Sequence, residues 1–133
     1  MNKKKLFNID QLIGLILKLK KKNLSIGFTN GCFDLLHKGH LSLLFQSKKK
    51  CDYLVVAINS DNSTKQLKGD DRPKDNQSVR IYKLSNLDEV DAIIIFNEDN
   101  PLKLITAIKP DILFKGSDYN EKEIVGADFI MKN

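Results

Sequence analysis

The sequence of 133 residues is short of the residues that mark several protein classes: it has no tryptophan, two cysteines, three prolines and two histidines. No apolar run approaches the roughly 20 residues that span a bilayer, so we expect no membrane association. Cys32 and Cys51 do not form a CxxC pair, which favours a reducing compartment over a disulfide framework. The basic start is not followed by the apolar segment of a signal peptide, so we expect a cytoplasmic protein.

Arginine is also scarce, because only Arg72 and Arg80 stand among the 22 basic residues. Residues 1–50 carry 11 lysines and two aspartates, a net charge of +9, whereas residues 51–133 carry a net charge of −4. A basic half suits nucleic acid, a membrane surface or a phosphorylated small molecule. Arginine is the usual bidentate reader of bases, so its scarcity disfavours sequence-specific nucleic-acid binding.

The pattern of apolar residues predicts strands that alternate with helices. We expect helices at 8–22, 34–50, 78–87 and 101–108, strands at 25–29, 53–58, 92–96 and 112–114, a long polar loop at 59–78, and a turn with a short helix at 117–133. Alternation of this kind is typical of an α/β, Rossmann-like three-layer fold with a parallel sheet. We predict one domain over residues 1–133, with an N-terminal helix in 1–23 and the core in 24–133.

The chemistry is concentrated where the first predicted strand meets the next helix, in Thr29–His40 (TNGCFDLLHKGH). Both histidines of the chain, His37 and His40, lie there, and Gly31 and Gly39 let a ligand approach the backbone closely. Their spacing is not that of HExxH, and no nearby residue completes a metal site, so we predict no metal ligands. A helix N-terminus at this junction favours an anion instead.

The segment resembles the signature of the cytidylyltransferase-like nucleotidyltransferases, in which phenylalanine and aspartate precede an HxGH motif. The matching blocks are Thr29–His40, Val56–Pro73, Arg80 and Phe114–Tyr119, and among subfamilies they are most similar to the adenylyltransferases that form ADP-heptose. The resemblance implies catalytic roles for His37, His40 and Lys48, nucleotide contacts for Thr29, Asn30, Gly31, Cys32, Phe33, Gly39, Arg80, Lys115 and Gly116, and substrate contacts for Asp34, Lys68, Arg72 and Asp118. Solvated or structural roles stay open for Lys48, Arg72 and Arg80.

The resemblance implies transfer of AMP from ATP, with Mg²⁺, to heptose 1-phosphate, and it implies a homodimer and a partner sugar kinase. Both reacting groups are anionic phosphates, so the site needs cations and in-line positioning more than a strong base. Family members continue past residue 130 into a strand, a Ser/Thr motif and a helix, and we expect this unit to be absent. The alternatives are a glycerol-3-phosphate cytidylyltransferase and a truncated, non-catalytic nucleotide-binding module.

Overall fold

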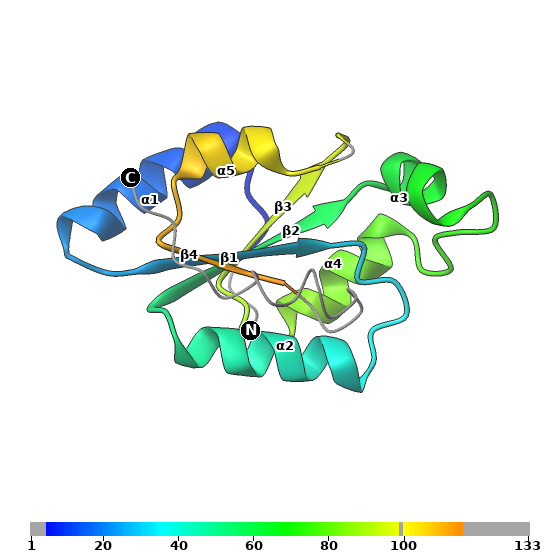
Figure 1. The fold of residues 1–133 in the computed structure, drawn as a ribbon, viewed down its shortest axis with the longest axis horizontal. Helices are drawn as coiled ribbons and strands as arrows, with labels where there is room; N and C mark the ends of the chain where they lie inside the picture. The colour runs from blue at the N-terminus through cyan, green and yellow to red at the C-terminus, as the bar shows by residue number, and fades with distance from the viewer. Residues whose placement is uncertain (1–4, 99, 116–133) are drawn as a thin grey trace.

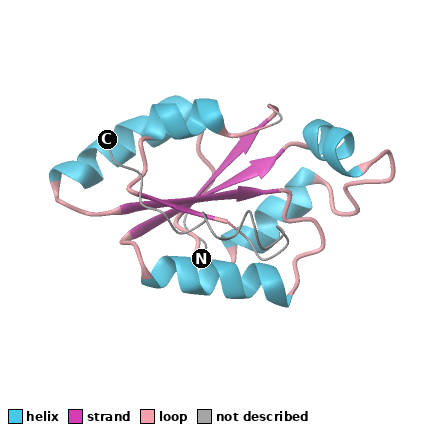
Figure 2. Cartoon of the chain, viewed as in Figure 1, coloured by secondary structure: helices cyan, strands magenta, loops and turns pink. Residues whose placement is uncertain are grey.

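The computed structural model describes residues 5–98 and 100–115, which form three layers (Figures 1 and 2). A parallel sheet lies between α1 and α5 on one face and α2 and α4 on the other. The elements in chain order are α1 (Ile9–Lys21), β1 (Ile26–Gly31), α2 (Lys38–Lys49), β2 (Tyr53–Asn59), α3 (Asp61–Lys68), α4 (Gln77–Ser85), β3 (Ala92–Phe96), α5 (Leu102–Ile108) and β4 (Ile112–Phe114). The predicted α/β three-layer fold is confirmed.

The four strands lie in the order β3-β2-β1-β4, so the chain reverses direction across the sheet beside β1. All strands are parallel, and their carboxyl ends therefore meet at one edge, on the right in Figure 1. We call this the carboxyl edge and the opposite one the amino edge. In open parallel sheets, ligands bind at the carboxyl edge where the strand order reverses.

The sheet is buried on both faces because its strands are continuous apolar runs. In β2, Val55 and Ala57 join the core under α1 and α5, whereas Leu54, Val56 and Ile58 join the core over α2 and α4. The predicted strand at 53–58 is thus confirmed, and those at 92–96 and 112–114 match β3 and β4 residue for residue.

The amino edge is organised by an aspartate directly before each of β2, β3 and β4. Each carboxylate accepts a hydrogen bond from a backbone N–H at the start of the neighbouring strand. The pairs are Asp52 with Ser25, Asp91 with Leu54, and Asp111 with Ile26, each at 2.7 Å. These N–H groups lie at the strand starts, and the side-chain acceptors close the sheet there.

Helix α1 is confirmed within a residue at each end, and Asn8 begins it. The Asn8 side chain accepts from the Gln11 N–H, and the Gln11 side chain accepts from the Asn8 N–H, a complete capping box. Leu12 and Ile16 are buried, whereas Leu17 is exposed. In the described part of the chain, no helix is long and apolar enough to cross a membrane.

Two predicted boundaries are wrong at the carboxyl edge. The long loop expected at 59–78 contains α3, which Ser60 caps through its hydroxyl and which ends at Gly69, where φ is +115°. The helix expected from Asp34 begins four residues later, because Leu35 has a φ of +54° that an α-helix does not allow. Helices 78–87 and 101–108 agree within two residues with α4 and α5.

Candidate active site

The predicted motif lies at the carboxyl edge, but its first residues belong to the strand. Asn30 and Gly31, which lie after the strand expected at 25–29, pair with Ala57 and Ile58 as the last residues of β1. Thr29 lies inside the sheet, fully buried. The space that Gly31 leaves is filled by the chain itself, since an added Cβ would lie 3.3 Å from the Phe33 ring. In this structure the glycine therefore allows Phe33 to fold back rather than a ligand to approach.

The two histidines form the N-terminal cap of α2. The His37 Nδ1 accepts from the Gly39 N–H at 3.0 Å, and the His37 N–H donates to the His40 Nδ1 at 3.2 Å. Their rings stack with centroids 3.9 Å apart, and the Phe33 ring lies 5.2 Å from that of His40. Because both Nδ1 atoms accept, each neutral ring carries its proton on Nε2. Both imidazoles are thus donors through Nε2, at the positive end of a helix dipole, which favours an anion.

Asp34 is turned toward the chain rather than toward a ligand. Its carboxylate is 1% exposed and accepts from the Arg72 Nε at 2.6 Å and from the N–H groups of Lys74 and Asp75, both at 2.8 Å. Burial raises the pKa of Asp34, but these donors outweigh burial and lower it overall. The predicted direct contact of Asp34 with substrate is corrected, because the residues of the loop already occupy its oxygens.

Arg72 is placed beside the histidine segment by this ion pair, and its side chain is 28% exposed. The hydrogen bond from its Nε to Asp34 raises the pKa of the guanidinium, so Arg72 is charged at every working pH. Lys68 is exposed in the last turn of α3, the helix that follows β2 at the carboxyl edge. Lys115 is exposed directly after β4, whereas Gly116 and Asp118 lie outside the described residues.

Arg80 is corrected from a nucleotide ligand to a buried structural residue, because four of its five N–H donors are taken by the chain. It is 1% exposed, and its Nη1 donates to the carbonyl oxygens of Cys32 and Asn59, both at 2.7 Å. Its Nη2 donates to Asp61 at 2.8 Å, and its Nε donates to the Asp75 carbonyl at 3.1 Å. Arg80 thereby connects the ends of β1 and β2 with α3 and the following loop.

Sequence reasoning missed Asn59, Asp61 and Asp75 as partners of this arginine. A signal for the burial of Arg80 was present in the sequence. Leu84 lies four residues after Arg80, and so on the same face of α4, and it is 1% exposed. A basic residue on an apolar helical face is expected to point inward, where only hydrogen-bond partners make it tolerable.

The predicted catalytic role of Lys48 is corrected, because Lys48 lies at the amino edge of the sheet, whereas the histidines lie at the carboxyl edge. Helix α2 begins at the carboxyl edge and, at about 1.5 Å per residue, carries Lys48 on the order of 15 Å away. There its Nζ donates to the Asp91 carboxylate at 2.6 Å and to the Asp52 carbonyl at 2.7 Å. The periodicity predicted the helix but not its direction across the sheet.

The described residues offer no ready-made metal cage, since no group of three or more His, Cys, Asp or Glu side chains is placed to hold an ion there. Two carboxylates at the carboxyl edge, those of Asp34 and Asp61, both bind arginine.

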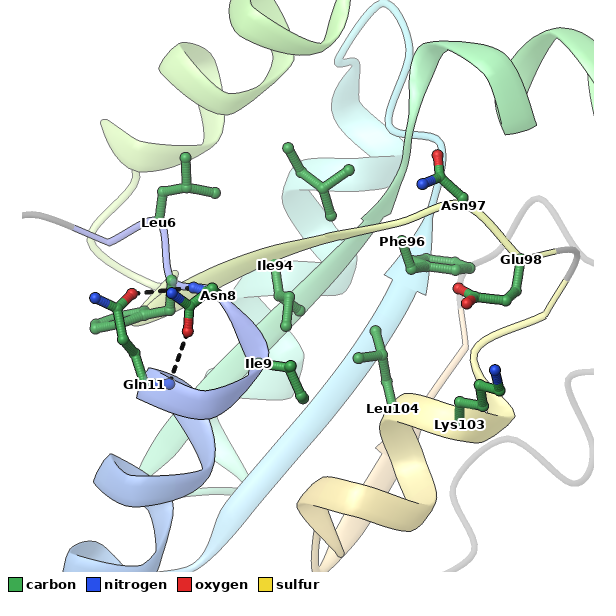
Figure 3. Close-up of a pocket in the computed structure, with 12 residues that line it drawn as sticks. Leu6, Asn8, Ile9, Gln11, Ile94, Phe96, Asn97, Glu98, Lys103 and Leu104 are labelled. Atoms are coloured by element: carbon green, nitrogen blue, oxygen red, sulfur yellow. Dashed lines mark hydrogen bonds between the residues drawn. The ribbon is translucent and has the colours of Figure 1, made fainter.

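A separate pocket of about 740 Å³ lies on the α1 and α5 face of the sheet, between β3 and the segment before α1 (Figure 3). Leu6 forms a parallel bridge with Ile93, so this segment extends the sheet beyond β3. Ile9, Phe96 and Leu104 make much of the lining apolar, and none of the predicted site residues takes part. The pocket therefore lies apart from the histidine pair.

Comparison with known proteins gives matches that cover most of the chain. Residues 28–127 match the family model described as cytidylyltransferase-like. A bifunctional protein HldE from Hyphomonas neptunium is 50% identical over 94% of this chain and 26% of its own length. HldE from Helicobacter pylori is 56% identical over 78% of this chain and 23% of its own length, so the chain spans about a quarter of these relatives.

A solved structure is similar over nearly its whole length. The lipopolysaccharide core biosynthesis protein of Thermoplasma volcanium is 30% identical with a TM-score of 0.61, over 83% of this chain and 98% of that chain. A pantoate-beta-alanine ligase from Francisella tularensis shares the fold, with a TM-score of 0.62 at 23% identity over 84% of this chain and 56% of its own. Since the family model covers well over half of the sequence, the chain belongs to the cytidylyltransferase-like family.

Proposed function

We propose that this chain transfers AMP from ATP to heptose 1-phosphate and releases pyrophosphate, forming ADP-heptose. The observation that carries the proposal is the histidine pair at the start of α2. Both imidazoles accept through Nδ1 and therefore donate through Nε2, beside the N–H groups of a helix N-terminus. The identity of about 50% to the HldE proteins supports the choice of sugar phosphate.

The chemistry needs donors and cations more than it needs a base. An oxygen of the sugar's phosphate attacks the α-phosphorus of ATP, a new P–O bond forms, and the bond to the pyrophosphate oxygen breaks. Negative charge builds on the α-phosphoryl oxygens and on the leaving group, where donors held in place stabilise the transition state. His37 and His40 supply N–H donors, and Arg72 and Lys68 supply positive charge at the same edge.

A covalent intermediate on Cys32 is disfavoured by its surroundings. Its side chain is buried, with the thiol directed at the Asn59 Oδ1 at 3.6 Å, and the Nδ1 atoms of both histidines accept hydrogen bonds within the helix cap. An activated cysteine nucleophile requires an adjacent base. Direct transfer between two phosphates fits this site better.

Magnesium belongs to the proposal as the companion of the triphosphate. The described residues do not fit a protein-held magnesium site, because the nearby carboxylates are bound to Arg72 and Arg80. Mg²⁺ commonly keeps several waters and binds substrate phosphates. We therefore assign its coordination to ATP and water and derive no step from it.

The supply of the substrate suggests a partner. The HldE relatives are named bifunctional, and this chain spans about a quarter of their length. A sugar 1-phosphate must come from a phosphorylating enzyme, so we propose a sugar kinase as the partner, on a separate chain or in a larger one. A homodimer and a cytoplasmic location stay predictions.

The test is pyrophosphate release by this chain, with ATP and heptose 1-phosphate in one assay and CTP and glycerol 3-phosphate in another. Turnover in the first assay alone supports the proposal. Turnover in the second alone reassigns the chain to cytidylyl transfer. ATP binding with no pyrophosphate release from either pair establishes the non-catalytic module, and the same chain extended by a further strand and helix then shows whether that unit restores turnover.

A further inference from the structure

The segment Arg72–Asp75 is held from two sides by buried side chains of opposite charge. On one side, the Asp34 carboxylate accepts from the Arg72 Nε and from the N–H groups of Lys74 and Asp75. On the other side, the Arg80 Nε donates to the Asp75 carbonyl. Both the N–H and the carbonyl of Asp75 are thus fixed by side chains, one 41 residues away along the chain and the other five residues away.

The Asp34 contact leaves the outer part of the Arg72 guanidinium available. Within the described residues, its ion pair uses Nε, and the side chain is 28% exposed. A planar guanidinium bound at Nε is fixed in orientation, while its two Nη atoms keep the fork geometry that matches a phosphate. Asp34 is three residues before His37, so the fork that Asp34 holds lies at the same edge of the sheet as the histidine segment, although Arg72 itself belongs to the loop between α3 and α4.

Arg80 has the opposite arrangement. Its side chain is fully buried, and its Nε, Nη1 and Nη2 atoms all donate within the chain. A phosphate that approached Arg80 would have to displace carbonyl oxygens that mark the ends of β1 and β2. The two arginines therefore differ in what they offer a ligand, although both lie in the loop and helix that the family resemblance marks as basic.

We propose that Asp34 and Arg80 are positioning residues that hold Arg72, and that the Arg72 Nη atoms bind a substrate phosphate. The proposal deepens the proposed function and rests on it for the identity of the phosphate. The phosphate belongs either to ATP or to the sugar phosphate, and the experiments separate the two. The resemblance implies that Asp34, Arg72 and Arg80 all contact a ligand. We instead assign the ligand contact to Arg72 and supporting roles to Asp34 and Arg80.

The first experiment uses the fact that the chain has two arginines. The ¹⁵N–¹H spectrum in the arginine Nε region is expected to show two signals, and the Arg72→Lys variant removes and so assigns one. MgATP, heptose 1-phosphate and inorganic pyrophosphate are titrated separately into the full chain. We expect at least one of them to shift the Arg72 signal, with the Arg80 signal changing little. A response of Arg80 without a response of Arg72 overturns the proposal.

The second experiment compares two aspartates with matched chemistry. Asp34→Asn weakens the hold on Arg72, whereas Asp91→Asn removes a carboxylate that also binds a basic side chain and a backbone N–H, at the amino edge. We expect Asp34→Asn to raise the KM of one phosphate substrate about tenfold, as loss of a charge-assisted contact does. Asp91→Asn is expected to leave both KM values within about twofold, since its contacts are distant from the histidines.

A double variant separates positioning from a merely structural effect. If Asp34 acts through Arg72, then Asp34→Asn combined with Arg72→Lys raises that KM no further than Arg72→Lys alone. Multiplying effects, or equal KM changes for Asp34→Asn and Asp91→Asn, overturn the proposal. If the parent chain shows no turnover, the spectrum still decides. An Arg72 signal that responds to pyrophosphate then supports the positioning model while the proposed function fails.

Discussion

The amino edge and the carboxyl edge of the sheet share a local arrangement, in which an aspartate binds both a basic side chain and backbone N–H groups, but the arrangement serves a different purpose at each edge. At the amino edge, Asp91 binds Lys48 and the Leu54 N–H. At the carboxyl edge, Asp34 binds Arg72 and two backbone N–H groups. In both places an aspartate beside a strand joins a basic side chain to the backbone. The difference lies in what remains of the basic group once the aspartate has bound it.

A lysine and an arginine differ in this respect by their shape. Lys48 has one nitrogen, and it donates to both Asp91 and the Asp52 carbonyl, so its charge is used to close the edge. Arg72 has three nitrogens, and its contact with Asp34 engages Nε. A carboxylate can therefore fix an arginine without using up its donors. On our proposal, this difference is why the donors of Lys48 are used within the amino edge, whereas Arg72 keeps donors for an anion at the carboxyl edge.

The largest expected effect is a loss of turnover when a histidine at the carboxyl edge is replaced. His40→Ala removes a donor from the start of α2 and should lower turnover by about 10²- to 10³-fold, the usual loss for one donor to a developing charge. The free energy of unfolding should fall by only about 1 kcal/mol, because His40 is half-buried and its loss removes one hydrogen bond of the helix cap. Pyrophosphate release and urea unfolding measure the two quantities. Unchanged turnover in an active parent would contradict the assignment of this edge as the site.

The next largest effect is expected on the free energy of unfolding. It tests whether the buried guanidinium of Arg80 stabilises the carboxyl edge. Arg80→Met keeps an apolar chain but leaves the carbonyl oxygens of Cys32, Asn59 and Asp75 without their donor. At about 1 kcal/mol for each unsatisfied buried group, the free energy of unfolding should fall by about 3 kcal/mol. Urea unfolding of Arg72→Met, which removes a partly exposed arginine, serves as the control. A loss no greater than that of Arg72→Met would contradict the burial of Arg80.

The sequence predicted the layers of the molecule because its strands and helices have strong apolar patterns. The continuous apolar runs in β2 and β3 predict buried strands, and Asn8 with Gln11 specifies the start of α1. Helix α3 was missed because it is polar, although Ser60 and Gly69 are ordinary signals for its start and end. Asn30-Gly31 predicts a turn locally, but pairing with β2 decided its conformation.

The candidate site was only partly predictable, since side-chain partners come from distant segments. The histidine motif is local, and the structure places it at the carboxyl edge as expected. The roles of Asp34 and Arg80 depend on contacts 38 to 48 residues away along the chain, with Arg72 and with Cys32. The spacing of Arg80 and Leu84 within α4 indicates that Arg80 points inward, but no local pattern names its partners or shows that Arg72 is exposed to a ligand. Lys48 was misplaced for the same reason, because the direction of α2 is set by the sheet.

A smaller effect tests the Asp34 pairing through pH. The pKa of Asp34 in the folded chain lies below its ordinary value of about 3.8, so its carboxylate stabilises the fold above that pH. This contribution is lost as the pH falls through the lowered pKa of the folded state. The stability difference between the parent and Asp34→Asn should be constant from pH 7 to about pH 4 and shrink below it. A difference that stays constant or grows below pH 4 would contradict the pairing.

The smallest effect is expected at the amino edge and completes the comparison. Lys48→Met removes a partly exposed ion pair, which contributes at most about 1 kcal/mol, and the apolar stem of the side chain is retained. Turnover and both KM values should stay within about twofold of the parent, because Lys48 lies at the far end of α2 from the histidines. If turnover instead fell by tenfold or more with unfolding unchanged, the charge of Lys48 would act on the site across the length of the helix. The two edges would then not act independently. The distinction between Lys48, whose donors bind only the chain, and Arg72, whose Nη atoms bind a ligand, would no longer hold.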